Sequence, residues 1–262
     1  FVPLYLLYPS VLWLTFAKAL SYLSVPVVVY WWLKDKTDKK SCLVLSSVFG
    51  FWLLLLYKPA VNSRLFEFSP SSLVLPFIII AFAMMEKRRW LFFAISMIFL
   101  LGLKEHMGIV LIGFGLYRIF QKDYSTGALL SGLGFLISYT LIFQVMPYFR
   151  DYQPFINTQI DPFHNIQGKL IYLFKLNSPL GFLPLIFWRY GILAAPAIGV
   201  NFITGRDAMF SSTFHYDDIS SILLLMTCVM VVLEKRDSFL LWLKFRWSKY
   251  AIVFWIFGLM LF

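Results

Sequence analysis

The sequence predicts an all-α membrane protein, a polytopic bundle of transmembrane helices, and three observations support that prediction. Of its 262 residues, 60% are hydrophobic and 20% are aromatic. Only 14% are charged, against about 25% in an ordinary soluble domain. The apolar residues form long runs separated by short charged clusters, as transmembrane helices do. The two cysteines, Cys42 and Cys228, exclude a disulfide framework and a cysteine-built zinc site.

About ten apolar segments are predicted to be membrane segments. They cover residues 10–33, 41–57, 71–85, 90–103, 107–120, 127–146, 169–187, 190–203, 219–233 and 250–262. We expect them to form one transmembrane domain over residues 1–262. The chain starts at Phe1, without a basic leader, and stops inside an apolar run. We therefore expect both ends to be truncated and the chain to be the middle of a longer protein.

The charged clusters predict the orientation in the membrane. The clusters at 34–40, 86–89, 118–123 and 234–249 alternate with less basic loops. If they are cytoplasmic, 15 of the 23 Lys and Arg lie inside and 7 outside, with Lys18 within a span. The positive-inside rule then places the N-terminus outside. The net charge of +10 follows from this topology and does not indicate nucleic-acid binding.

Residues 90–120 decide the topology, because they are either one long helix or two short ones that meet at Lys104-Glu105-His106. A single helix would split the cations almost evenly across the membrane, so we expect a hairpin. Each arm of 14 residues rises about 21 Å, less than the roughly 30 Å hydrocarbon core. Glu105 is therefore expected below the outer lipid surface, where an acid needs polar partners or water.

Other polar residues have competing interpretations. Asp217 and Asp218 precede a predicted span, and a role as helix caps is favoured. Lys18 and Arg189 either snorkel or line a cavity, and both readings stay open. For His164 we favour simple solvation. No fixed ligand spacing such as HExxH indicates a metal site.

Three stretches resemble a known family. They are Phe66-Glu67-Phe68-Ser69-Pro70, Lys104-Glu105-His106 and Phe214-His215-Tyr216. Their order and spacing resemble an uncharacterised family of predicted prokaryotic multi-pass membrane proteins, related to the GT-C glycosyltransferases. The resemblance implies an integral protein of the prokaryotic plasma membrane with a GT-C-like fold. It also implies a polyprenyl-phosphate sugar donor at the outer leaflet.

The chain departs from that family at two positions. Ser69 stands where the family usually has histidine, and His106 stands where it usually has an acid. Serine cannot replace histidine as a metal ligand or as a base near neutral pH. By the same alignment, the catalytic acid that GT-C enzymes usually carry in the first outer loop lies upstream of Phe1.

The predicted function is transfer of a sugar from a polyprenyl-phosphate donor, with membrane lipid as the other partner and no nucleic acid. We assign Glu105, His106 and Glu67 to catalysis, and Lys104, Arg64, Arg206 and His215 to phosphate binding. No cofactor and no metal are assigned. We expect Glu105, His106, Arg64, Glu67, His215 and Arg206 to converge on one outward-facing polar cavity. The alternative is a transporter or lipid flippase with such a cavity.

Overall fold

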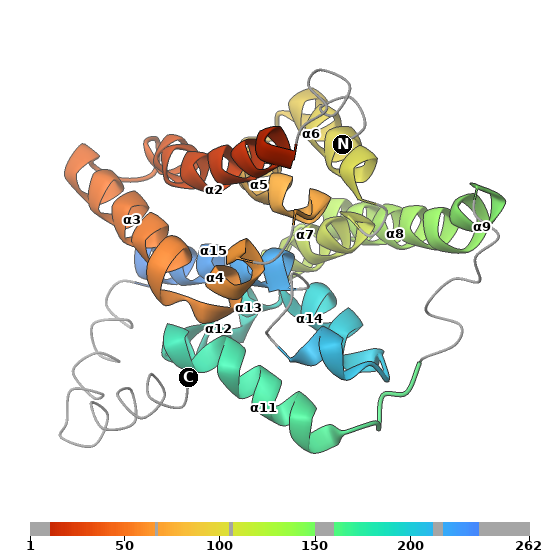
Figure 1. The fold of residues 1–262 in the computed structure, drawn as a ribbon. Helices are drawn as coiled ribbons and strands as arrows, with labels where there is room; N and C mark the ends of the chain where they lie inside the picture. The colour runs from red at the N-terminus through yellow and green to blue at the C-terminus, as the bar shows by residue number, and fades with distance from the viewer. Residues whose placement is uncertain (1–10, 66–67, 105–106, 150–159, 212–216, 236–262) are drawn as a thin grey trace.

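The structure, a computed structural model, describes residues 11–65, 68–104, 107–149, 160–211 and 217–235. These residues are helical apart from turns and one isolated bridge between Ile160 and Thr204 (Figure 1). The α-helices are α2 (Val11–Leu33), α3 (Lys39–Phe51), α4 (Lys58–Leu65), α5 (Leu75–Glu86), α6 (Trp90–Leu103), α7 (Gly108–Phe120), α8 (Tyr124–Thr140), α9 (Met146–Phe149), α11 (Ile166–Asn177), α12 (Leu183–Ile186), α13 (Trp188–Gly191), α14 (Ala195–Ile203) and α15 (Asp218–Glu234). Short π-helical or 3₁₀ turns complete the fold: η1 (Trp52–Leu56), η2 (Pro70–Leu73), η4 (Leu141–Val145), η5 (Ser178–Leu180) and η6 (Asp207–Phe210).

The all-α prediction is confirmed for these residues, but two predicted segments are broken. Segment 169–187 divides into α11, η5 and α12, because the chain turns at Gly181 and Phe182, which both have positive φ angles (63° and 58°). Segment 190–203 divides between α13 and α14, and Pro196 lies at the start of α14. Apolar runs locate these helices but do not show where a buried chain reverses. The predicted segment 250–262 lies outside the described residues.

The prediction of about ten membrane segments is wrong for this structure. Among the described residues, three helices are long and apolar enough to cross a membrane: Val11–Leu33, Lys39–Leu56 and Tyr124–Val145. Helices α5, α6 and α7 have 12, 14 and 13 residues and rise only about 18–21 Å. Hydrophobicity alone marked them as spans, whereas crossing a core of roughly 30 Å also requires length.

The predicted hairpin over residues 90–120 is confirmed. Helix α6 ends at Leu103 and α7 begins at Gly108. The contact between Phe93 of α6 and Phe114 of α7, whose ring centroids are 6.3 Å apart, shows that the chain folds back between the two helices. At the far end of α7, Nη2 of Arg118 donates to the carbonyl of Met85, just before α6, at 2.8 Å. Glu105 and His106 lie outside the described residues.

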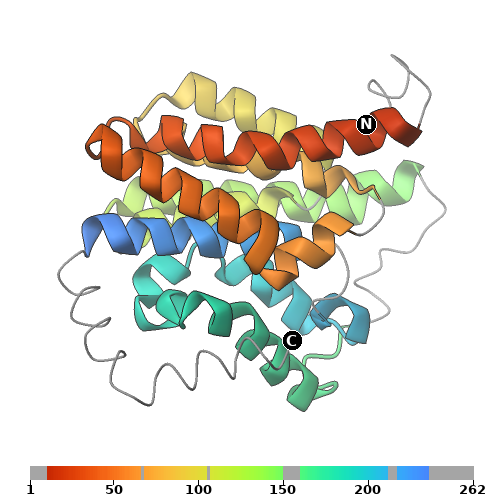
Figure 2. The ribbon, with the colours of Figure 1, turned by 60° about the vertical axis from the view of Figure 1, so that its left-hand side comes forward.

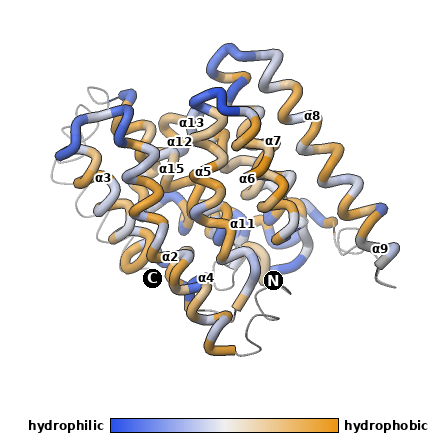
Figure 3. Tube along the Cα trace, turned by 90° about the horizontal axis from the view of Figure 1, so that it is seen from above, coloured by the Kyte–Doolittle hydropathy of each residue, from blue (hydrophilic) through white to orange (hydrophobic). Residues whose placement is uncertain are grey.

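The basic loops before α3, α6 and α8 lie together at one end of the bundle, as predicted. Ion pairs join them: Lys36 to Glu86 (2.7 Å), Lys87 to Asp35 (2.6 Å), and Arg88 and Arg118 to Asp123 (4.0 and 3.8 Å). The hydrogen bond from Lys87 lowers the pKa of Asp35, so the Asp35 carboxyl group is charged at neutral pH. In Figure 3 the hydrophilic stretches before α3 and α8 stand apart from the predominantly hydrophobic helices. We call this end the basic end.

Cysteine labelling tests which side the basic end faces. With Cys42 and Cys228 replaced by alanine, we expect Lys40→Cys to react with a membrane-impermeant maleimide only after the cells are opened. Phe163, before α11, is 79% exposed, and Phe163→Cys is expected to react from outside intact cells. The reverse pattern would overturn the positive-inside assignment.

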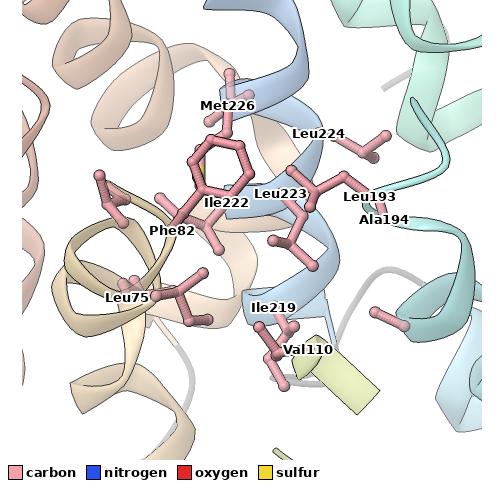
Figure 4. Packing of buried hydrophobic residues seen from close by; sticks show 14 of the residues in the cluster. Leu75, Phe82, Val110, Leu193, Ala194, Ile219, Ile222, Leu223, Leu224 and Met226 are labelled. Atoms are coloured by element: carbon pink, nitrogen blue, oxygen red, sulfur yellow. The ribbon is translucent and has the colours of Figure 1, made fainter. Parts of the chain in front are cut away.

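Helix α15 is the centre of the fold. It lies between α3, α4 and α5 on one side and α12, α13 and α14 on the other (Figure 1). Its apolar residues Ile219, Ile222 and Leu223 pack against neighbours that include Leu75 and Phe82 of α5, as Figure 4 shows. All its residues from Asp218 to Thr227 are buried, the polar ones included, because the rest of the bundle covers this part of α15.

The outer helices present large apolar side chains on the surface of the bundle. Residues of this kind, each at least 55% exposed, are Phe16, Leu20 and Leu23 on α2, Leu91, Phe92 and Ile98 on α6, and Leu129, Phe135 and Leu136 on α8. A soluble monomer rarely exposes so continuous an apolar surface. These exposed apolar side chains are suited to contact with the hydrocarbon chains of membrane lipids.

Candidate functional site

Two adjacent acids lie in the interior at the start of α15. Asp217 and Asp218 are each 1% exposed, although their neighbours along the helix are apolar or hydroxylic. Neither acts as the predicted cap, because no side chain hydrogen-bonds the backbone at this helix start. A buried carboxylate has to find other partners, since isolated burial is costly.

Asp218 takes its partners from α2 and η2. The hydroxyl of Tyr22 donates to its Oδ1 at 2.5 Å, and the hydroxyls of Ser71 and Ser72 donate to its Oδ2 at 3.0 and 3.5 Å. The Ser69 hydroxyl lies 2.8 Å from that of Ser71 and extends this network. Ser69, which stands where the family described above usually has histidine, is therefore linked to the buried Asp218 through the hydroxyl of Ser71.

Asp217 takes its partners from α11 and α14. The hydroxyl of Tyr172 donates to its Oδ1 at 2.6 Å, and the side-chain amide of Asn201 donates to the Tyr172 hydroxyl at 2.8 Å. Tyr57, which is also buried, is a near neighbour of Asp217 and donates to the Leu176 carbonyl at 2.9 Å. The acid pair thus connects both sides of the bundle.

Three cations accompany the acid pair. The charges of Lys18 and Lys104 both act on Asp218, and that of Arg64 acts on Lys18 and Tyr22. Lys18, in α2, is 5% exposed and donates to the Ser63 carbonyl at 3.2 Å. The Nε of Arg64 is buried and has no hydrogen-bond partner within the described residues.

The cluster lies deep along α2 and away from the basic end. Tyr22 is eleven residues from either end of α2, a rise of about 16 Å. At the other end of α15, Glu234 accepts a hydrogen bond from Tyr190 at 3.0 Å. The charges of Glu234 and Glu86 both act on Tyr117, which places that end of α15 at the basic end. Figure 2 shows the α2–α3 turn and the end of α15 on the same side.

The predicted site residues are distributed as follows. Lys104 and Arg64 belong to the neighbourhood of Asp218. Arg206 is exposed and precedes η6, where Asp207 lies 3.3 Å from Nε2 of His164. Both of these side chains are exposed to solvent. Glu67, Glu105, His106 and His215 lie outside the described residues.

No group of three His, Cys, Asp or Glu side chains that could hold a metal occurs among the residues that the structure describes. The reactive and charged groups of the described cluster are its carboxylates, tyrosines, serines and cations.

The comparison with protein families gives a match over residues 1–262 to the family described as "Predicted membrane protein (DUF2079)". The chain belongs to this family. No curated protein and no solved structure matches it.

Membership of this family confirms the resemblance to an uncharacterised family of predicted membrane proteins, and it assigns no chemistry. Sequence reasoning missed Tyr22, Tyr172, Ser71 and Asn201, which hold the acid pair. One signal was available: two consecutive acids at the edge of an apolar helix exceed what a single cap requires.

Proposed function

We propose that this family member is a glycosyltransferase-like membrane protein that transfers a sugar from a polyprenyl-phosphate donor at the outer leaflet. The observation that supports it is the burial of two carboxylates and of Lys18 inside an apolar helical bundle, with the half-buried Arg64 and Lys104 nearby. Ionisable groups at such depth are costly to keep and mark functional sites by default.

The position of the cluster supports a substrate that enters from the outer leaflet. The cluster lies at the end of α15 that is far from the basic end. Because the basic end is predicted to face the cytoplasm, the cluster is expected on the outer side. A lipid-linked donor keeps its chain in the membrane, so its phosphate arrives at the depth of a recessed polar cluster.

The cations supply what a phosphate needs. Arg64 is the strongest candidate, because its buried Nε has no hydrogen-bond partner among the described residues and a guanidinium binds phosphate oxygens through parallel hydrogen bonds. Lys104 adds a point charge. Asp218 accepts hydrogen bonds at both oxygens, so it acts as a fixed counter-charge that positions Lys18 and Lys104.

The proposed reaction is a substitution at the anomeric carbon. A hydroxyl oxygen of the acceptor forms a bond to this carbon, and the bond from the carbon to the phosphate oxygen breaks. Its electron pair leaves with polyprenyl phosphate, whose charge the cations stabilise. A carboxylate takes the acceptor proton; Glu105, next to Lys104 in sequence, is the base we propose. His106 and Glu67 are proposed to assist, while Arg206 and His215 bind phosphate.

The test is sugar transfer by the full-length protein in vesicles supplied with radiolabelled polyprenyl-phosphate hexoses. We expect Glu105→Gln to lower transfer by at least about a hundredfold, the usual contribution of a general base, without changing the melting temperature. Asp38→Asn, which removes an exposed acid at the basic end, is the matched control and should keep full transfer. Full activity of Glu105→Gln would remove Glu105 from the mechanism.

The same vesicles distinguish the transporter or flippase. Movement of the labelled lipid across the bilayer without a sugar-containing product would contradict the transferase proposal, because the same charges would then line a pathway.

A further inference from the structure

Three buried oxygens lie on one face of α15. They are Oδ2 of Asp217 and the hydroxyls of Ser220 and Ser221; none makes a hydrogen bond of good geometry within the described part of the chain, and the Ser221 hydroxyl faces that of Tyr57. All three residues are at most 1% exposed. Positions i, i+3 and i+4 share a helix face, so the three side chains gather on one side.

A fourth oxygen comes from the end of α11. The amide nitrogen of Asn177 donates to the Leu173 carbonyl at 2.9 Å, whereas its Oδ1 is buried without a partner among the described residues. Tyr57 brings the two regions together, because it donates to the Leu176 carbonyl and is a near neighbour of both Asp217 and Ser221.

Within the described residues, the cations of this region act on Asp218, and none acts on Asp217. Lys18 and Lys104 act on Asp218, whereas the charged neighbour that acts on Asp217 is Asp218 itself. Tyr172 occupies one oxygen of Asp217 with a neutral donor. A buried carboxylate beside a second carboxylate requires a positive charge or a proton.

We propose that Asp217, Ser220, Ser221 and Asn177 form a binding site for one small monovalent cation, with sodium as the ion that fits. Carboxylate, hydroxyl and amide oxygens are ligands for hard cations. Because the site has one carboxylate, Asp217, a monovalent cation balances its charge better than a divalent cation would. The site lies on the α11 side of the acid pair, whereas the proposed phosphate-binding cations lie toward α2, so it goes beyond the proposed function and is independent of it.

The experiment measures the melting temperature of the purified full-length protein in detergent, in sodium, potassium or choline chloride at constant ionic strength and pH. A ligand that binds the folded state at 100 times its Kd is expected to raise the melting temperature by about 4 °C or more. We expect this rise in sodium and not in choline. Asp217→Asn should remove it, and Ser96→Ala, which changes an exposed hydroxyl on α6, should keep it.

A second variant covers the case in which Asp217→Asn does not fold. Ser220→Ala combined with Ser221→Ala removes two small hydroxyls and should shift the sodium concentration for half-maximal stabilisation upward at least tenfold. Equal melting temperatures in all three salts would overturn the proposal, and so would a sodium response that persists in the double variant. A melting temperature that depends on pH but not on sodium would also overturn it, because a proton would then balance Asp217.

Discussion

Replacing Gly134 with valine is expected to destabilise the protein by about 3 kcal/mol, because the new side chain would separate α7 from α8. A Cβ at Gly134 would lie 2.7 Å from the Gly108 carbonyl oxygen and 2.8 Å from the Ile112 nitrogen. Both are backbone atoms, so neither moves without moving the helix. The same close approach recurs between Gly115 and Gly127, as expected where small residues let two membrane helices pack closely.

Gly132→Val is the matched control on the same helix. Gly132 is exposed, and a Cβ there meets no atom within 4 Å among the described residues. We expect it to change stability by less than about 0.5 kcal/mol, as most surface substitutions do. Thermal unfolding followed by tryptophan fluorescence compares the two variants. Equal stability of both would show that α7 and α8 do not pack as closely as described.

The sequence allows the helices to be located but not all of their lengths or breaks. The boundaries of α2 and α6 agree with the predicted segments 10–33 and 90–103, because charged loops and apolar runs mark them directly. The turn at Gly181 and Phe182 lies inside an apolar run, so hydropathy does not reveal it. Short helices such as α5 were counted as membrane spans because their sequences are apolar, although a helix of 12 residues is too short to cross the hydrocarbon core.

The candidate site was predicted only in part, for a similar reason. Lys104 and Arg64 were assigned to phosphate binding from their charge and neighbouring motifs; the charge of Lys104 acts on Asp218, and that of Arg64 acts on Tyr22, which binds Asp218. Tyr22 is 196 residues from Asp218 along the chain, and helical periodicity does not reveal which distant helix will be its neighbour. The acids were interpreted as caps because a cap needs only local sequence, whereas a buried network needs the packing.

Asp218→Asn is expected to abolish sugar transfer and to destabilise the protein by about 3 kcal/mol, although it keeps the size of the side chain. It removes the negative charge that acts on the buried Lys18 and on Lys104. Transfer should fall because the cations that bind phosphate lose the group that positions them. Asp35→Asn, at an exposed ion pair of the basic end, is the control and should change neither property appreciably.

A double-mutant cycle with Tyr22→Phe separates this network from a simple helix-end effect. If Asp218 acts through Tyr22, the two substitutions together should cost less than the sum of their separate costs, by about 1–2 kcal/mol, because Tyr22→Phe removes the hydrogen bond whose acceptor charge Asp218→Asn removes. An acid that only complements the helix dipole contributes about 0.3–1 kcal/mol and does not depend on a tyrosine of another helix. Additive costs together with a loss below 1 kcal/mol for Asp218→Asn would therefore return Asp218 to the role of a helix cap. A measurable coupling would instead establish that α2 and α15 meet through this carboxylate, which the proposed site requires.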